Sequence, residues 1–250
     1  MEATNFNFTL LRELADRISA GRAAQRTTRE STHSEFNVFR ALGLVGYELP
    51  TSRFLSYLLN PKGDHDCDGT FLHAFLETLC EDEPQPAGNR EEASRRLERV
   101  KDLLDNHSCK VHREYRTKGG RSIDIVLEFP DFRIGIENKI EAGDQPNQVH
   151  DYSDFLGASG LILYLTKFGS ESETAGDKPY VQLSYQNHIR AWLDRCLKKM
   201  GDAPRVFENL RQFRDSIDEF LNPNCDAVMT NFSEFIIKEP EILRHQFDIV

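Results

Sequence analysis

Residues 121–152 read RSIDIVLEFPDFRIGIENKIEAGDQPNQVHDY and carry the clearest pattern in the chain. Two runs rich in Ile, Val, Leu and Phe, residues 122–129 and 132–140, flank Pro130 and Asp131. They predict two strands joined by a tight turn. Proline fits the first central position of a type I turn but not the primed two-residue turns, so we expect a four-residue loop. The sequence therefore predicts a β-hairpin.

The register of this hairpin brings acidic side chains together. It places Asp124 directly opposite Glu137, and opposed residues have Cβ atoms about 4.5–5.5 Å apart. Strand alternation puts Lys139 on the same face as Glu137. Hard divalent cations such as Mg²⁺ take carboxylate oxygens, keep several waters and bind phosphates. We therefore predict that the two carboxylates share one cation, with Lys139 beside it to orient the attacking water and offset phosphate charge.

A helix is predicted directly after the hairpin. Gln148 and Tyr152 have i, i+4 spacing, so they share one face of that helix. Asp144 as the N-cap and Pro146 in the first turn predict where it begins.

Together these residues resemble the signature of the PD-(D/E)xK nuclease superfamily. Asp124 is followed on the next strand by Glu137-Asn138-Lys139, with Ile123 where the proline of the name would lie. Gln148 and Tyr152 resemble the QxxxY element of exonuclease-like branches. The resemblance implies an α/β restriction-endonuclease-like core that hydrolyses DNA phosphodiester bonds with Mg²⁺ or Mn²⁺. It also implies that Gln148 and Tyr152 support the metal shell or the scissile strand.

The N-terminal part extends the resemblance. Residues 52–55, 60–65 and 71–76 match a pattern of one bacterial and phage branch of the superfamily, which implies a setting such as defence against foreign DNA. Glu48 lies where such families place an additional acid on the first core helix, and there it joins the metal cluster or holds its water. A helix-start charge favoured by the macrodipole is the alternative for Glu48. Thr51 departs from the pattern, which has His at that position.

Other functions stay open at this point. An acidic-x-Lys triplet is a short pattern, although it occurs only once in the chain, at Glu137. A catalytically inactive binding module with the same fold and an RNA-directed nuclease are the two alternatives. The lone histidines His65 and His73 are expected to be structural, because no third metal ligand has a suitable spacing.

The net charge of −10 is unusual for a nucleic-acid enzyme, because duplex binding draws on phosphate contacts from Lys and Arg. Residues 110–121, KVHREYRTKGGR, carry five cations against one acid. We predict that Arg113, Arg116, Lys118 and Arg121 contact the DNA substrate. An edge strand protected by its charges is the alternative reading. A basic partner subunit that grips the substrate would also offset the acidic balance. A homodimer is a separate possibility, because the aromatic stripe of Phe207, Phe213 and Phe220 fits either core packing or a dimer contact.

We expect residues 1–250 to form a single domain, because nothing marks a linker between two folded halves. The predicted core is a central mixed sheet of four to five strands flanked by helices. Its strands include the near-continuous apolar run of residues 161–165, which is typical of a strand buried on both faces. Extra segments are an N-terminal helix and polar linker in residues 1–34, an exposed insertion in residues 81–94, and C-terminal helices in residues 204–250.

The cellular location is expected to be cytoplasmic. No apolar run is long enough to cross a bilayer, and no basic-then-apolar leader follows Met1. The five cysteines are scattered and form no CxxC pair, so we expect reduced thiols.

Overall fold

The computed structural model describes residues 36–104, 108–140, 143–200 and 204–222. The helices are α2 (Val38–Ala41), α3 (Glu48–Leu59), α4 (Thr70–Glu81), α5 (Arg90–Glu98), α6 (Gln148–Leu156), α7 (Arg190–Lys199) and α8 (Pro204–Leu221). The strands are β1 (Gln85–Ala87), β2 (Lys110–Arg116), β3 (Ser122–Glu128), β4 (Arg133–Lys139), β5 (Gly160–Thr166) and β6 (Tyr180–Ser184). Short 3₁₀ segments cover Arg99–Leu103 and Gly157–Ser159, and a π-helical turn covers Tyr185–Ile189. The predictions for residues 1–34 and for the chain after residue 222 lie outside the described residues.

The six strands form one mixed sheet in the order β1-β6-β5-β4-β3-β2. Strands β2, β3 and β4 are antiparallel neighbours, β4, β5 and β6 run parallel, and β1 pairs antiparallel with β6. Helix α6 makes the crossover between β4 and β5, as a parallel connection requires. Every residue of β5 is buried, which confirms the prediction of a central strand.

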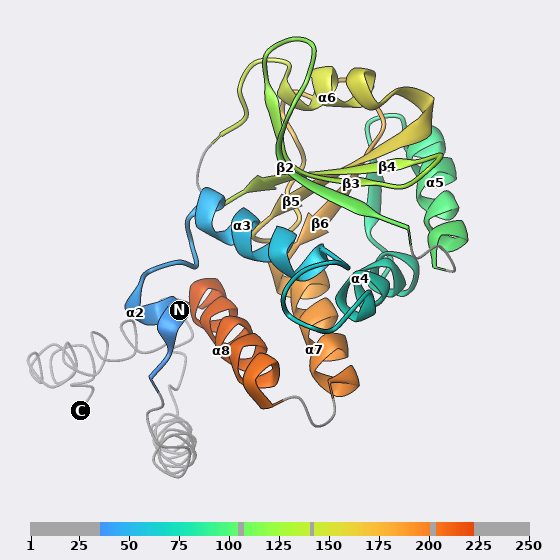
Figure 1. Cartoon of the computed structure of the whole chain (residues 1–250). Helices are drawn as coiled ribbons and strands as arrows, with labels where there is room; N and C mark the ends of the chain where they lie inside the picture. Colours follow the sequence, from blue (N-terminus) through green and yellow to red (C-terminus); the bar gives the residue numbers. More distant parts are fainter. Residues whose placement is uncertain (1–35, 105–107, 141–142, 201–203, 223–250) are drawn as a thin grey trace, which may run out of the picture.

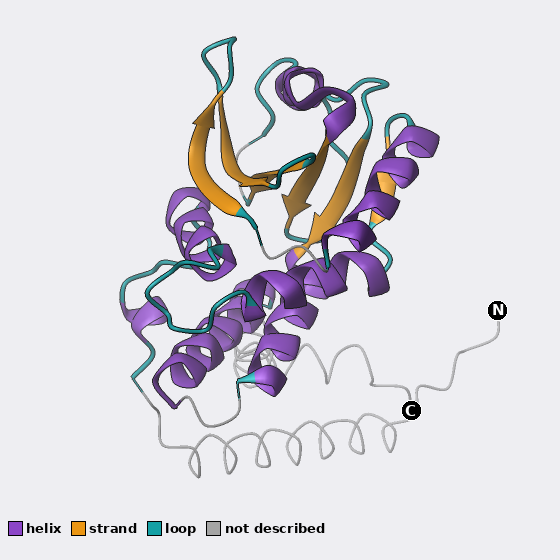
Figure 2. Ribbon diagram, turned by 45° about the vertical axis from the view of Figure 1, so that its right-hand side comes forward, coloured by secondary structure: helices purple, strands orange, loops and turns teal. Residues whose placement is uncertain are grey.

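Helices cover both faces of the sheet (Figure 1, Figure 2). Helix α6 lies on one face, and α3, α4, α7 and α8 lie on the other. The larger apolar core lies under the second group, where Trp192 packs on Phe75 and donates its indole N–H to the carbonyl of Phe71 at 2.8 Å. A smaller core under α6 includes Val149 and Tyr152. The predicted mixed sheet flanked by helices is therefore confirmed.

The hairpin register is the predicted one. The amide of Phe129 donates to the carbonyl of Phe132 at 2.9 Å, which closes a four-residue loop. The last paired residues toward the open end are Ile125 and Ile136. Asp124 and Glu137 therefore lie one position beyond the final pair, where the two strands have begun to separate and leave room between them.

The prediction of an exposed insertion over residues 81–94 is wrong. Gln85–Ala87 form the edge strand β1, and Ala87 and Ala93 are buried. The helix predicted from residue 95 begins at Arg90, where the side chain of Asn89 accepts the amide of Glu92. A three-residue strand is too short to show the alternation of a β-strand. Glu91 and Glu92 lie in the first turn of α5, where the helix dipole favours acidic side chains, so their polarity did not indicate a loop. The sheet consequently has one strand more than predicted.

The predicted start of α6 is also wrong. The helix begins at Gln148 after Asn147, which has a positive φ of 57°, and not at an Asp144 cap. The carboxylate of Asp144 instead accepts hydrogen bonds from the hydroxyls of Tyr164 at 2.7 Å and Thr174 at 3.2 Å. Tertiary partners have taken the side chain that local sequence assigned to a cap.

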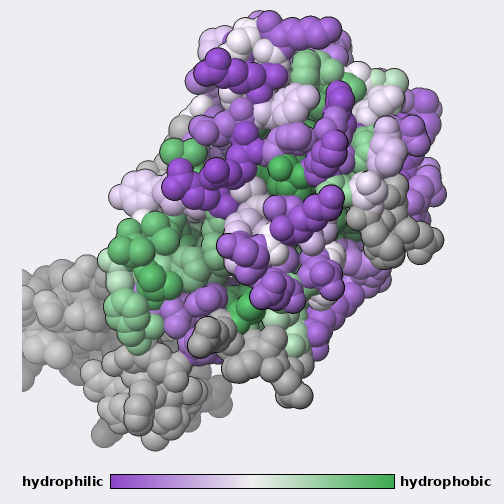
Figure 3. Space-filling model, in the orientation of Figure 1, coloured by the Kyte–Doolittle hydropathy of each residue, from purple (hydrophilic) through white to green (hydrophobic). Residues whose placement is uncertain are grey.

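Exposed apolar side chains gather over α2 and the start of α3, visible as a green area in Figure 3. They are Phe36, Leu42, Tyr47 and Leu49. Among the helices of the described residues, none is both long and apolar enough to cross a membrane.

Candidate active site at the open end of the hairpin

An open pocket of about 420 Å³ lies where β3 and β4 separate. Its walls are Glu48, Gly120, Arg121, Ser122, Asp124, Glu137, Lys139, Gln145, Gln148 and Tyr152. The six residues predicted as catalytic thus line one cavity, although they come from α3, β3, β4 and α6. Their chemical roles remain predictions that the contacts below help to define.

The two carboxylate oxygens of Glu137 have different surroundings. Oε1 accepts hydrogen bonds from Nε2 of Gln148 at 2.7 Å and from Nζ of Lys139 at 3.2 Å. Oε2 is buried and has no hydrogen-bond partner among the residues that the structure describes. An unpaired buried carboxylate oxygen is costly, and polar groups inside proteins are almost always satisfied. The orphan oxygen therefore fits a ligand position for a hard cation.

Asp124 is held from the neighbouring strand. Its Oδ2 accepts the backbone N–H of Asn138 at 2.9 Å. The position across from it on β2 is Glu114, which has a positive φ of 48° and is absent from the β2–β3 pairs. A non-glycine residue with this φ is uncommon. The sheet is therefore distorted on both sides of Asp124, at the same level as the pocket.

Burial disfavours the charged form of both acids. It raises the pKa of Asp124 to about 6 and the pKa of Glu137 to about 8. The negative charge of Asp124 adds to the rise for Glu137, and the ammonium of Lys139 opposes it. A divalent cation between the two carboxylates would reverse this balance, because it stabilises the ionised form of each.

Gln148 and Tyr152 act on Glu137 from α6. The hydroxyl of Tyr152 donates to the carbonyl of Ser122 at 2.6 Å and accepts from Nε2 of Gln148 at 3.1 Å. Oε1 of Gln148 accepts the amide of Gln145 at 3.1 Å. Every polar atom of the Gln148 carboxamide is thus used within the protein. These contacts favour support of a metal ligand over contact with the scissile strand.

Glu48 approaches the pocket from the first turn of α3. Its Oε1 accepts the amide of Ile140 at 3.0 Å. Within the described part of the chain, no three His, Cys, Asp or Glu side chains group as ligands of one ion. A cation here would take the carboxylates of Asp124 and Glu137 and complete its shell with water and phosphate oxygens, as Mg²⁺ commonly does. That arrangement favours the version in which Glu48 holds a metal-bound water.

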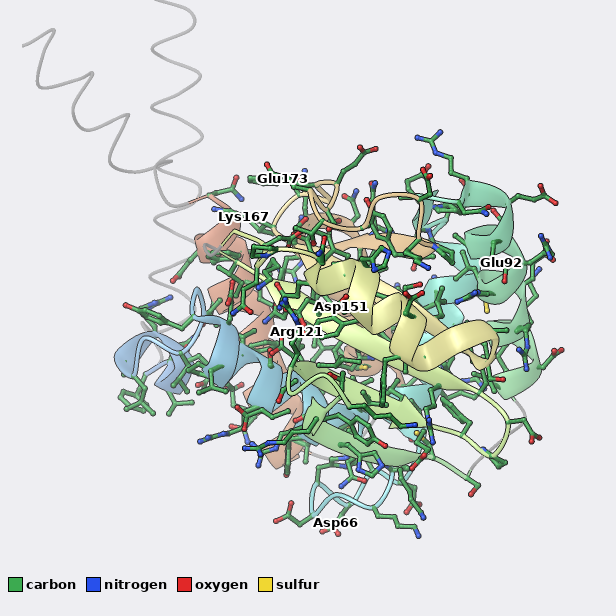
Figure 4. All side chains as sticks on the ribbon, turned by 90° about the horizontal axis from the view of Figure 1, so that it is seen from above. Asp66, Glu92, Arg121, Asp151, Lys167 and Glu173 are labelled. Carbon is green, nitrogen blue, oxygen red and sulfur yellow. The ribbon has the colours of Figure 1, made fainter. Side chains whose placement is uncertain are left out.

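The four predicted substrate contacts fall into two groups. Arg121 pairs with Asp151 at 3.1 Å and donates to the carbonyl of Pro146 at 2.7 Å, so it ties the β2–β3 turn to α6 (Figure 4). Arg113, Arg116 and Lys118 are exposed, and none makes an ion pair with another described residue. Arginines elsewhere pair with acids, among them Arg96, Arg133, Arg195 and Arg214. The unpaired cations on β2 and its turn offset locally the acidic balance of the chain.

Asn138 and Gln145 also contribute to the site, although neither was predicted to have a role there. The side chain of Gln145 gave no indication of its role, because it is the backbone amide of Gln145 that donates to Gln148. The side chain of Asn138 did give one. It occupies the strand face that otherwise bears Ile134 and Ile136, so a buried polar side chain is conspicuous there.

Comparisons with known proteins agree with this geometry at the level of the family. The family model described as the PD-(D/E)XK nuclease superfamily matches residues 36–222, well over half of the chain. No curated protein and no solved structure matches the chain. The mixed sheet with its flanking helices is consistent with the restriction-endonuclease-like fold. The chain therefore belongs to the PD-(D/E)XK nuclease superfamily.

Proposed function

We propose that this protein is a metal-dependent nuclease that hydrolyses phosphodiester bonds in DNA. One observation carries the proposal: Oε2 of Glu137 lacks a partner among the described residues and is buried in a pocket that Asp124 and Lys139 also line. Membership of a nuclease superfamily supports the reaction class. The placement in the bacterial and phage branch remains part of the proposal.

Each pocket residue has a defined task in this proposal. When bound, Mg²⁺ or Mn²⁺ supplies positive charge to the phosphate and lowers the pKa of a bound water. Asp124 and the free oxygen of Glu137 hold the cation. Lys139, already 3.2 Å from Glu137, orients the attacking water and stabilises charge that develops on the phosphate. Glu48 holds a water at the edge of the shell.

Substrate binding is assigned to the cations on β2 and the turn after it. Arg113, Arg116 and Lys118 are exposed without acidic partners in the described chain, as phosphate-binding side chains need to be. A role in bacterial defence rests on the sequence resemblance. A cytoplasmic location is also proposed, supported by the free thiols of the four described cysteines.

The test is a cleavage assay with plasmid DNA, linear DNA, single-stranded RNA and tRNA, each with Mg²⁺, Mn²⁺ or EDTA. We expect DNA cleavage that EDTA abolishes. Lys139→Ala should lower the rate roughly a hundredfold or more, while Lys199→Ala, whose ammonium pairs with Glu77 away from the pocket, should leave it unchanged. Survival of all DNA with both metals would favour the inactive binding module, and cleavage of RNA alone would reassign the substrate.

A further inference from the structure

Asn138 joins three elements at the base of the pocket. Its side chain is buried and donates through Nδ2 to the hydroxyl oxygen of Ser52 at 3.0 Å and to the carbonyl of Glu48 at 3.3 Å, both on α3. Its Oδ1 accepts the hydroxyl of Tyr185 at 2.8 Å. The orientation of the carboxamide follows from chemistry, because the Glu48 carbonyl can only accept and must face the amide nitrogen.

The same residue also holds a predicted metal ligand. The backbone N–H of Asn138 donates to Oδ2 of Asp124, and the next amide but one, that of Ile140, donates to the carboxylate of Glu48. Glu48 is therefore fixed to the end of β4 twice, by its backbone carbonyl and by its side chain. Asn138 thus bonds to both Asp124 and Glu48.

Tyr185 completes the network from the far side. It is fully buried, and it is the first residue of the π-helical turn that follows β6. π-Helical turns are rare and are frequent at functional sites. Here the turn brings the Tyr185 hydroxyl to the Asn138 carboxamide, which leaves Nδ2 directed at α3.

We infer that Asn138 is a positioning residue that sets Glu48 relative to Asp124 and so to the pocket. The inference rests on the proposed function and deepens it. In this arrangement Ser52, Asn138 and Tyr185 fix the angle at which α3 meets the strand that carries Glu137 and Lys139. Asn138, which lies between Glu137 and Lys139 on β4, thereby aligns Glu48 on α3.

Two test variants and one control probe this network without removing it whole. Asn138→Ala leaves several buried partners unsatisfied and risks unfolding. Ser52→Ala removes a single contact at a helical position that alanine tolerates well. Tyr185→Phe removes only the hydroxyl, and Tyr180→Phe is its matched control, because the Tyr180 hydroxyl accepts the amide of Ser172 and touches none of these residues.

The first measurement uses metal-free protein. Hydrogen exchange at the Ile140 amide reports directly on the Glu48 carboxylate that it bonds. We expect Ser52→Ala and Tyr185→Phe to speed this exchange by roughly fivefold, the effect of about one lost hydrogen bond. Tyr180→Phe should not change it. Unchanged exchange at Ile140 in both test variants would overturn the inference.

The second measurement is a double-mutant cycle on cleavage. Ser52→Ala should lower kcat by roughly fivefold with KM unchanged. In a Glu48→Ala background it should lower kcat no further, because the group it positions is gone. Equal losses of kcat in both backgrounds would overturn the positioning role of Asn138 and leave the proposed function intact. A wild-type protein that cuts no nucleic acid would overturn the proposed function, and the positioning role with it.

Discussion

Glu137 makes two kinds of contact with one carboxylate. Oε1 is held by Gln148 and Lys139, while Oε2 is left without a hydrogen bond in the described chain. This division separates orientation from ligation: one oxygen fixes the side chain, and the other is available to a cation. A carboxylate whose second oxygen had a protein donor would have less to offer a metal ion.

Glu137→Gln tests that division. Glutamine keeps the shape of the side chain but removes the negative charge, so we expect affinity for Mn²⁺ to fall at least about tenfold and turnover roughly 10²–10³-fold. The metal-free protein should be as stable as the wild type or more so, because a buried carboxylate is removed. Titration calorimetry with Mn²⁺, a cleavage assay and thermal unfolding measure the three effects. Unaltered Mn²⁺ affinity would show that Glu137 is not a ligand.

The raised pKa values of Asp124 and Glu137 predict a pH dependence of stability. The ordinary values are 3.8 and 4.5, and the folded protein holds these protons up to about pH 6 and about pH 8. Between each ordinary value and its raised counterpart the native state keeps a proton that the unfolded state has released. The contribution of these two acids to stability is therefore greatest below about pH 4 and falls as the pH rises. We expect the metal-free wild type to lose stability from about pH 4 to about pH 8, relative to a variant in which both acids are replaced by their amides.

Mg²⁺ should restore the lost stability at the upper end of the pH range. The cation binds the ionised carboxylates, so its stabilising effect should be small at pH 5 and large at pH 8, and its binding should release protons. Thermal unfolding with Mg²⁺ and with EDTA across this range is the measurement. The Asp124→Asn, Glu137→Gln double variant is the control: it keeps the other titrating groups, His188 among them, and should lack both the loss from these two acids and the effect of Mg²⁺. Wild-type stability that rises with pH relative to the double variant would contradict the assignment.

For single residues, the sequence predicted which side chains lie opposite each other, but not which of their atoms form hydrogen bonds. The turn chemistry of residues 129–132 placed Asp124 at the level of Glu137, because a hairpin register follows from its loop. In Glu137, Oε1 has hydrogen-bond donors and Oε2 has none in the described chain. This difference depends on the rotamer of Gln148 and on the bond of Gln148 to Tyr152. Those features arise only when α6 docks.

Helix α6 is the element that braces the site. Gln148 touches Glu137, and Tyr152 fixes Gln148 through its bond to the carbonyl of Ser122. Gln148→Ala should reduce metal affinity and kcat by roughly 10–100-fold, the usual effect of losing a partner that orients a ligand. Tyr152→Phe should have a smaller effect in the same direction.

A control for this prediction lies on the same helix. The hydroxyl of Ser153 donates to the carbonyl of Pro179, away from the pocket. Ser153→Ala should therefore lower stability by about 1 kcal/mol without altering metal affinity. Cleavage and Mn²⁺ titration of the three variants decide the matter. If Gln148→Ala and Ser153→Ala behave alike, α6 contributes stability and no alignment of Glu137.

Elements with a strong periodic signal were predictable, and those shaped by tertiary contacts were not. The apolar run of β5 and the two hairpin strands appear as expected. Strand β1 was missed because three residues show no period, and its pairing with β6 spans a long sequence separation. The start of α6 was misplaced because Asp144 bonds to Tyr164 and Thr174 instead of capping a helix.

The whole molecule shows how an acidic chain can keep a few exposed cations without acidic partners. Most of the arginines named above are neutralised by nearby acids, whereas Arg113, Arg116 and Lys118 have no acidic partner among the described residues. Net charge is therefore a poor guide to the field at the pocket, since local charge governs contact with phosphate. The net charge follows from the composition, but which cations form ion pairs could be known only from the fold.

Arg113→Gln, Arg116→Gln and Lys118→Gln combined should weaken DNA binding and reduce its dependence on salt. Each lost duplex phosphate contact should reduce the slope of log K against log salt by about 0.9. The matched control replaces Arg90, Lys101 and Lys198 by Gln, which changes the charge equally at three other exposed positions. DNA binding titrated over a series of salt concentrations is the measurement. Equal slopes for the two triple variants would show that charge on β2 and its turn has no special role.

The central claim is that Asp124 and Glu137 share one divalent cation in the pocket beside Lys139. Anomalous diffraction from a crystal soaked in Mn²⁺ tests it most directly. We predict one strong peak in contact with Oε2 of Glu137 and a carboxylate oxygen of Asp124, at about 2.0–2.3 Å from each. A crystal with Mn²⁺ bound only elsewhere, or with no peak in this pocket at saturating Mn²⁺, would contradict it.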